Sequence, residues 1–305
     1  MICQYLKFTT KWELTNMAKI ILILALYLTA CAPQNLSKSS NKAFQKITGL
    51  KTPESVVQAK DGRIFISEIA EFGKDGDGQI SVVDTVGKVS VFASGLDDPK
   101  GLKITGENLY VADKTKIIKI GLNDAKSSVF VPASGFATTP QFLNDLEADL
   151  QGNLYVSDSG DILGSGKGGA IYKIDSNGKA SLIIDGKQDA RIMAPNGLLA
   201  DDTGNILIYV DFTSGVLYTL NQQTKALDDI AEGFGGGDGI VHHSNGTMYV
   251  SDWKSGKVFS VSRKNEVTIL KEGYQSAADI AMTNDEKFLM VPDMKAGVLD
   301  FIPLN

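Results

Sequence analysis

Cysteine and histidine are scarce in this chain of 305 residues, which contains two of each. Cys3 and Cys31 are too few for a disulfide framework, and no CxxC or Cys/His cluster indicates a zinc site. The histidines are the adjacent pair His242 and His243, which disfavours an independent Ser-His-Asp catalytic centre. The classes of enzyme that depend on these side chains are therefore poor candidates.

A surplus of basic charge is also missing, because the formal net charge is -6. Nucleic-acid-binding proteins carry basic patches, so we expect no nucleic-acid partner. Charged residues make up 22% and hydrophobic residues 43% of the chain, which is ordinary for a folded globular protein. We expect a monomer with a mixed, solvated surface.

No hydrophobic run is long enough to span a bilayer, but residues 20–28 form a short apolar segment after Lys19. It ends in Leu28-Thr29-Ala30-Cys31, which resembles the bacterial lipobox, in which the cysteine is acylated. This resemblance predicts a signal peptide over residues 1–30, a lipid on Cys31 and a flexible tether over residues 31–42. Met1 and Met17 are both candidate starts.

The predicted location is the cell envelope, with the membrane contacted through the lipid on Cys31. Because Ala32 rather than Asp follows the cysteine, the signal resembles those sorted to the outer membrane in a Gram-negative host. The alternatives are a plain signal peptide and a buried helix with a chance cysteine.

Residues 43–305 repeat a β-rich pattern with no sustained helical period. A stretch that ends in glycine recurs six times, about 40 to 50 residues apart, at Gly49, Gly95, Gly135, Gly186, Gly233 and Gly273. Each unit also holds short strands with a polar turn and a terminal acid, as in residues 152–158 and 246–252. About four strands in about 45 residues match one blade of a β-propeller. The fold class is therefore all-β, a six-bladed β-propeller.

The two ends of this region complete one blade. The last unit, residues 277–305, shows only three strands, whereas residues 43–49 have the form of a fourth strand and precede the first blade. We expect this N-terminal strand to close the last blade and cover its open edge. A five-bladed or open arrangement, which leaves one piece unpaired, is the alternative.

Polar residues begin the innermost strand of each unit, where a propeller presents the rim of its central channel. Alignment of the units places six residues at this point: Glu54, Lys100, Asn144, Asn196, Asp238 and Asp279. In four units the residue lies eight positions before a turn glycine, so Glu54, Asn144, Asn196 and Asp238 are expected to converge. Two carboxylates and two amides, without sulfur or imidazole, favour Ca²⁺, with Mg²⁺, Mn²⁺ and Zn²⁺ as alternatives. The competing interpretation is that Asn-Asp, Asn-Gly and Asp-Gly are ordinary turn dipeptides.

The ordered series Glu54, Asn144, Asn196 and Asp238, with Pro53 before the first and Gly197-Leu198 after the third, resembles the gluconolactonase/regucalcin propellers. The resemblance covers nearly all of residues 43–305. It implies that these four residues bind a catalytic divalent cation and that the protein hydrolyses lactones or other esters. Sugar-lactone members have an arginine two residues before the third-blade asparagine, where this chain has Phe142. A phenyl ring cannot donate hydrogen bonds to a sugar, so a more apolar substrate is favoured.

Two functions remain open on these grounds. In the first, the chain is a hydrolase of a small ester or lactone, with Asp238 as the base that activates water and Asp145 and Phe142 at the substrate. Loops at residues 70–78 and 159–169 are long enough to form the pocket wall. In the second, the chain is a non-catalytic envelope propeller that binds a partner and holds a structural metal.

Overall fold

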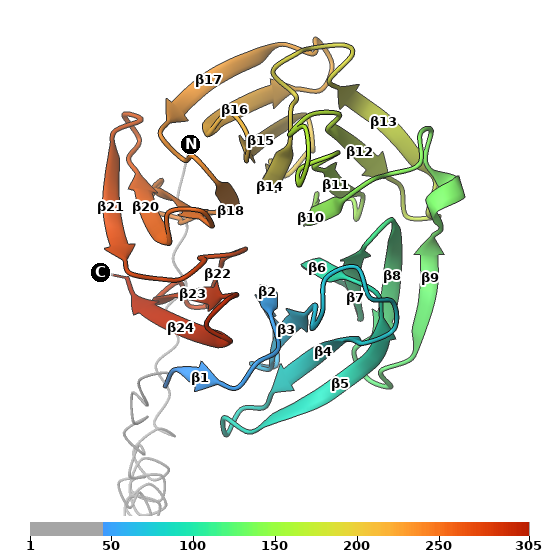
Figure 1. The fold of residues 1–305 in the computed structure, drawn as a ribbon, viewed down its shortest axis with the longest axis vertical. Helices are drawn as coiled ribbons and strands as arrows, with labels where there is room; N and C mark the ends of the chain where they lie inside the picture. Colours follow the sequence, from blue (N-terminus) through green and yellow to red (C-terminus); the bar gives the residue numbers. More distant parts are fainter. Residues whose placement is uncertain (1–44, 305) are drawn as a thin grey trace, which may run out of the picture. The chain divides into compact units, whose positions relative to one another are not determined.

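The computed structural model describes residues 45–304 as six four-stranded antiparallel sheets arranged around a central axis (Figure 1). From the axis outward, the first three sheets are β2 (Pro53–Gln58), β3 (Ile64–Glu68), β4 (Gly78–Val83) and β5 (Val89–Leu96); β6 (Pro99–Thr105), β7 (Asn108–Asp113), β8 (Lys116–Gly121) and β9 (Ser127–Val131); and β10 (Leu143–Ala148), β11 (Leu154–Asp158), β12 (Ala170–Ile174) and β13 (Ala180–Asp185). The next two are β14 (Pro195–Ala200), β15 (Ile206–Asp211), β16 (Val216–Asn221) and β17 (Leu227–Glu232); and β18 (Gly237–His242), β19 (Met248–Asp252), β20 (Lys257–Val261) and β21 (Val267–Glu272). The six-bladed β-propeller predicted from the repeats is confirmed.

The sixth sheet contains both ends of the described chain. Its strands are β22 (Ala281–Met282), β23 (Phe288–Asp293), β24 (Val298–Pro303) and β1 (Ile47–Thr48). Figure 1 shows β1, in blue, beside β24, in red, and the register pairs Ile47 with Leu299. The N-terminal strand therefore closes the last blade, as predicted. A short 3-10 turn at Ala133–Gly135 is the one helical element of residues 45–304, and no helix there is long and apolar enough to cross a membrane.

The core lies between neighbouring blades, where apolar side chains from adjacent sheets interdigitate. Phe65 of the first blade packs with Leu109 and Val111 of the second, and Tyr155 of the third packs with Leu207 of the fourth. Alternating strand residues supply these contacts, which is why the sequence shows a period of two rather than a helical period. The predicted signal peptide, tether and Cys31 lie outside the described residues.

Candidate metal centre and the channel

Each of the five complete inner strands begins with a β-bulge that turns two residues out of the ladder. In β2, Pro53 pairs with Glu68 and Val56 with Ile66, so Glu54 and Ser55 lie in the break. The same register shift occurs in the inner strands of the next four blades, at β6, β10, β14 and β18. Bulges of this kind re-aim side chains next to binding sites. Here they direct the first residue of each break toward one pocket.

Acids at the ends of the second strands hold these breaks in place. The Asp158 carboxylate accepts hydrogen bonds from the backbone N–H groups of Gln141 and Phe142, and the Asp211 carboxylate accepts from those of Met193 and Ala194. Buried carboxylates that accept two such bonds fix the chain that enters the inner strand. In these two repeats, the acid that ends the second strand is therefore a structural residue that positions the channel rim.

The four predicted metal ligands meet in one pocket. Glu54, Asn144, Asn196 and Asp238 all line it, and each is almost fully buried. Three oxygen atoms buried there have no hydrogen-bond partner within residues 45–304: Glu54 Oε2, Asn196 Oδ1 and Asp238 Oδ1. The Asn144 amide nitrogen donates to Ser159 Oγ at 3.1 Å, which leaves its carbonyl oxygen as the available acceptor. Buried polar atoms are almost always satisfied, so this convergence of unsatisfied oxygens fits a divalent cation.

The charge in this pocket is under-compensated by protein groups. Burial, together with Asp238 and Asp279, raises the pKa of Glu54 well above its usual value. Burial and the nearby Asp145 carboxylate raise the pKa of Asp238 to about 8. Such shifts mark carboxyl groups that lack counter-charge. In residues 45–304 no cluster of three or more His, Cys, Asp or Glu side chains has metal-binding geometry, so a cation in this pocket would need the oxygens of the two asparagines as well.

The walls of the pocket are apolar, and the cavity measures about 80 Å³. Phe72 from the loop after β3 and Ile162 and Leu163 from the loop after β11 line it, so both long loops form the wall as predicted. Phe142 lines the same pocket. The remaining apolar lining residues are Ile69, Phe212, Trp253 and Met294. Four of the lining residues also border a larger outer cavity of about 730 Å³: Phe72, Leu163, Trp253 and Met294.

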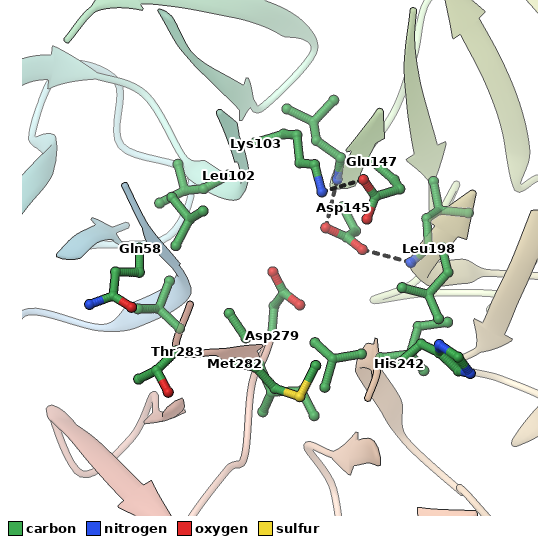
Figure 2. A pocket seen from close by; sticks show the side chains of 18 of the residues that line it. Gln58, Leu102, Lys103, Asp145, Glu147, Leu198, His242, Asp279, Met282 and Thr283 are labelled. Atoms are coloured by element: carbon green, nitrogen blue, oxygen red, sulfur yellow. Dashed lines mark hydrogen bonds and ion pairs between the residues drawn. The ribbon is translucent and has the colours of Figure 1, made fainter. Parts of the chain in front are cut away.

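Asp145 lies apart from these residues. As the second residue of its bulge it faces a different pocket, of about 360 Å³ (Figure 2). Its carboxylate accepts a hydrogen bond from the backbone N–H of Leu198 at 2.6 Å. The structure therefore brings Phe142 to the candidate metal centre and places Asp145 against the strand that carries Asn196.

The sequence alignment placed Asp279 at the rim position equivalent to Glu54, which is wrong by one residue. The sixth blade has an isolated bridge between Ala277 and Asp293, so Ala278 rather than Asp279 is equivalent to Glu54. Asp279 is equivalent to Asp145, and Figure 2 shows its carboxylate in the same pocket as Asp145. Its Oδ2 accepts a hydrogen bond from Ser55 Oγ at 2.5 Å.

Lys100 is the member of this rim to which the sequence assigned no role. It lines the metal-centre pocket and is 1% exposed. Its Nζ donates to the backbone oxygen of Asp98 at 3.2 Å and lies 4.1 Å from the centroid of the Phe142 ring. Burial lowers the pKa of Lys100, while Glu54 and Asp98 act in the opposite direction. The alignment of the repeats placed Lys100 on the axis, which was the one available signal.

These observations define a class of protein: a six-bladed propeller with a buried set of oxygen donors at one end of its channel. The model of the SMP-30/gluconolactonase/LRE-like region matches residues 101–284, more than half of the chain, so the chain belongs to this family. A search of curated protein sequences finds no match.

Solved structures share the fold at low sequence identity. Regucalcin from Agrobacterium tumefaciens, described as a calcium-binding protein, is 17% identical, with a TM-score of 0.63 over 80% of this chain and 82% of that chain. Virginiamycin B lyase from Staphylococcus aureus is 12% identical, with a TM-score of 0.59 over 86% of this chain and 99% of that chain. A chain of the nidogen/laminin complex is 18% identical, with a TM-score of 0.61 over 74% of this chain and 82% of that chain.

Proposed function

We propose that the chain is a divalent-cation-dependent hydrolase of lactones or related esters, with Ca²⁺ as the cation. The observation that carries the proposal is the set of three partnerless buried oxygens on Glu54, Asn196 and Asp238. Membership of the SMP-30/gluconolactonase/LRE-like family and the similarity to a calcium-binding regucalcin support it. Hard oxygen donors favour Ca²⁺ over Mg²⁺ and Mn²⁺, and the absence of nitrogen and sulfur from the set disfavours Zn²⁺.

The proposed roles follow from the geometry. Glu54, Asn144, Asn196 and Asp238 would hold the cation, which would supply polarisation of the ester carbonyl and stabilisation of the charge on its oxygen. Asp238 is the proposed base that accepts the proton of the attacking water, because its carboxylate lies in the same pocket as the proposed cation.

Asp145 is proposed as a positioning residue, because its bond to the Leu198 N–H holds the strand that carries Asn196. The apolar walls, with Phe142 among them, favour an ester with an apolar acyl or alkyl part over a sugar lactone.

A panel of aryl esters and lactones of increasing chain length tests the proposal, assayed with Ca²⁺ and with a chelator. We expect turnover that depends on the cation, falls by at least about 100-fold in Asp238→Ala and favours apolar substrates. No turnover by the unchanged protein, or equal turnover by Asp238→Ala, contradicts the enzymatic role.

A non-catalytic propeller with a structural cation is the second candidate. The similarity in fold to a chain of the nidogen/laminin complex favours it, because that structure is of a complex between proteins. Under this alternative Ca²⁺ raises the melting temperature, yet no ester on the panel is hydrolysed. The two measurements together separate the candidates.

We further propose that a lipid on Cys31 anchors the protein in the cell envelope, on the outer membrane in a Gram-negative host. The support is the Leu28-Thr29-Ala30-Cys31 sequence and the polar stretch after it. Fractionation of cells that express the unchanged protein and Cys31→Ser tests this proposal. We expect the variant to leave the membrane fraction and to lose the acyl mass, and a variant that stays membrane-bound contradicts the proposal.

A further inference from the structure

Three lysines lie over three aromatic rings that line the candidate metal centre. Lys100 Nζ lies 4.1 Å from the centroid of the Phe142 ring. Lys254 Nζ lies 4.3 Å from that of Phe212, and Lys295 Nζ lies 3.9 Å from that of Trp253. Lys100 is buried, whereas Lys254 and Lys295 are exposed. Of the three, Lys100 lines the pocket itself and Lys295 lines the outer cavity. An apolar pocket with an ammonium group on its wall complements a ligand that has both apolar and anionic parts.

Lys100 is the most informative of the three. In the part of the chain that the structure describes, its recorded hydrogen bond is to the Asp98 backbone oxygen, and no carboxylate lies within ion-pair distance of it. An ammonium group has three donors, so this buried one has capacity left toward the pocket. Glu54 and Asp98 act on this charge from beyond ion-pair distance. Buried charges are normally paired directly, so the free donors point to a partner that is not part of the chain.

The net charge of the cation-loaded pocket predicts that this partner is negatively charged. Among the residues that line the pocket, Glu54 and Asp238 would together balance one divalent cation, and the positive charge of Lys100 would then be in excess. A bound monoanion neutralises this surplus. Its oxygens would accept charge-assisted hydrogen bonds from the Lys100 ammonium, which are stronger than bonds between neutral groups.

The dimensions of the cavities indicate how such a ligand lies. The inner cavity, at about 80 Å³, has room for a small head group, whereas the outer cavity measures about 730 Å³. Phe72, Leu163, Trp253 and Met294 border both cavities, so an apolar chain can pass from one to the other along a continuous wall. Leu163 is 82% exposed and Phe72 is 46% exposed, and a ligand's chain would cover both.

We propose that this site binds a small amphiphilic carboxylate, with its head group at Lys100 and its apolar chain against Phe72, Leu163, Trp253 and Met294. The inference rests on the proposed cation site and deepens the proposed function, because hydrolysis of an ester releases a carboxylate. Lys100 is then the residue that determines specificity for the anionic head.

Calorimetric titration with 4-phenylbutyrate and with its neutral amide, in saturating Ca²⁺, tests the proposal. The two probes share one apolar part and differ in charge. We expect the acid to bind the unchanged protein at least about tenfold more tightly than the amide, and Lys100→Met to abolish that preference without weakening Ca²⁺ binding. By reciprocity, the acid should also tighten Ca²⁺ binding.

Two further variants keep the test independent of any loss of stability in Lys100→Met. Lys103→Met removes a lysine of the same strand that pairs with Glu147 in the other pocket, and it should retain the preference for the acid (Figure 2). Leu163→Ser alters an exposed side chain and should weaken the acid and the amide alike. Equal binding of acid and amide by the unchanged protein overturns the proposal, as does a preference that survives in a folded Lys100→Met.

Failure of the cation site has a different signature. If Ca²⁺ produces no binding heat, the proposed function loses its cofactor, and the acid and amide are then compared in chelator. A preference for the acid that depends on Lys100 under those conditions supports the anion site by itself, and equal binding overturns it.

Discussion

Gly197 lies so close to Asp238 that no side chain fits between them: a Cβ at position 197 would lie 2.4 Å from the Asp238 backbone oxygen. Gly197 directly follows Asn196 in its bulge, so two proposed ligands from adjacent blades are held together by one glycine contact. Gly101 makes the equivalent approach to Asn144, and Gly239 to Asp279. Glycine serves here to allow close packing of the inner strands.

Gly197→Ala should therefore damage the site and the fold together. The added methyl group has to displace backbone, and we expect an overpacking cost of about 1–3 kcal/mol and weaker Ca²⁺ binding. Gly235→Ala is the matched control, because a Cβ there meets nothing within 4 Å. Urea denaturation and calcium titration of both variants test this. A Gly197→Ala protein as stable as the control would show that the inner strands are not packed as described.

The pKa of Asp238, raised to about 8, predicts how pH affects the cation site. A divalent cation must displace the proton of this carboxyl, so affinity for Ca²⁺ should rise with pH up to about 8 and level off above it. Titration in buffers of different ionisation enthalpy should show at least one proton released at pH 7. Affinity that is constant from pH 6 to 9 contradicts the assignment.

Asp279 provides a pH prediction for the cation-free protein. Burial raises the pKa of Asp279 to about 7, above the value of an aspartate in an unfolded chain. Between about pH 4 and 7 the folded state holds a proton that the unfolded state releases, so the free energy of unfolding falls as pH rises through this range. Asp279→Asn keeps an acceptor for Ser55 and removes the ionisation.

The variant should consequently lose less stability than the unchanged protein between pH 5 and 8, measured by thermal unfolding in chelator. If stability changes with pH in the same way in both proteins, ionisation of the Asp279 carboxyl does not destabilise the folded state, which contradicts the prediction.

Closure of the ring by β1 predicts a large effect of a residue close to the N-terminal end of the described chain. Leu50 is buried against Val56, Leu299 and other core residues that join the first and last blades. Leu50→Ala should lower the free energy of unfolding by about 2–5 kcal/mol, whereas Leu150→Ala, at a site 77% exposed, should change it by less than about 0.5 kcal/mol. Equal effects in urea denaturation would mean that the ring does not depend on this contact.

Much of the fold could be predicted because each blade repeats one pattern. The number of copies of the strand that ends in an acid and of the stretch that ends in glycine gives the number of blades. The lack of a fourth strand in the last repeat predicts that the N-terminal strand closes the ring. The sequence also predicted that four side chains share one pocket, because each lies eight positions before a turn glycine: Glu54, Asn144, Asn196 and Asp238.

Other features of the channel were not predictable in this way, since a β-bulge has no distinct sequence signature. In a bulge, successive residues face different pockets, which separates Asp145 from Asn144. The same geometry places Asp279 one position away from the one expected from the alignment of the repeats. Lys100 was aligned with the axis, but its proposed role depends on its distance from the Phe142 ring and on the lack of a carboxylate at ion-pair distance in the described part of the chain. Both are features of the tertiary structure.

Calorimetric titration of the protein with Ca²⁺ at pH 8 is the most direct test of the cation centre. We expect one binding event per chain, weakened by at least about 100-fold in Asp238→Asn and retained in Asp279→Asn, because the Asp279 side chain faces the other pocket. The absence of binding heat in the unchanged protein, or unaltered binding in Asp238→Asn, would contradict this expectation.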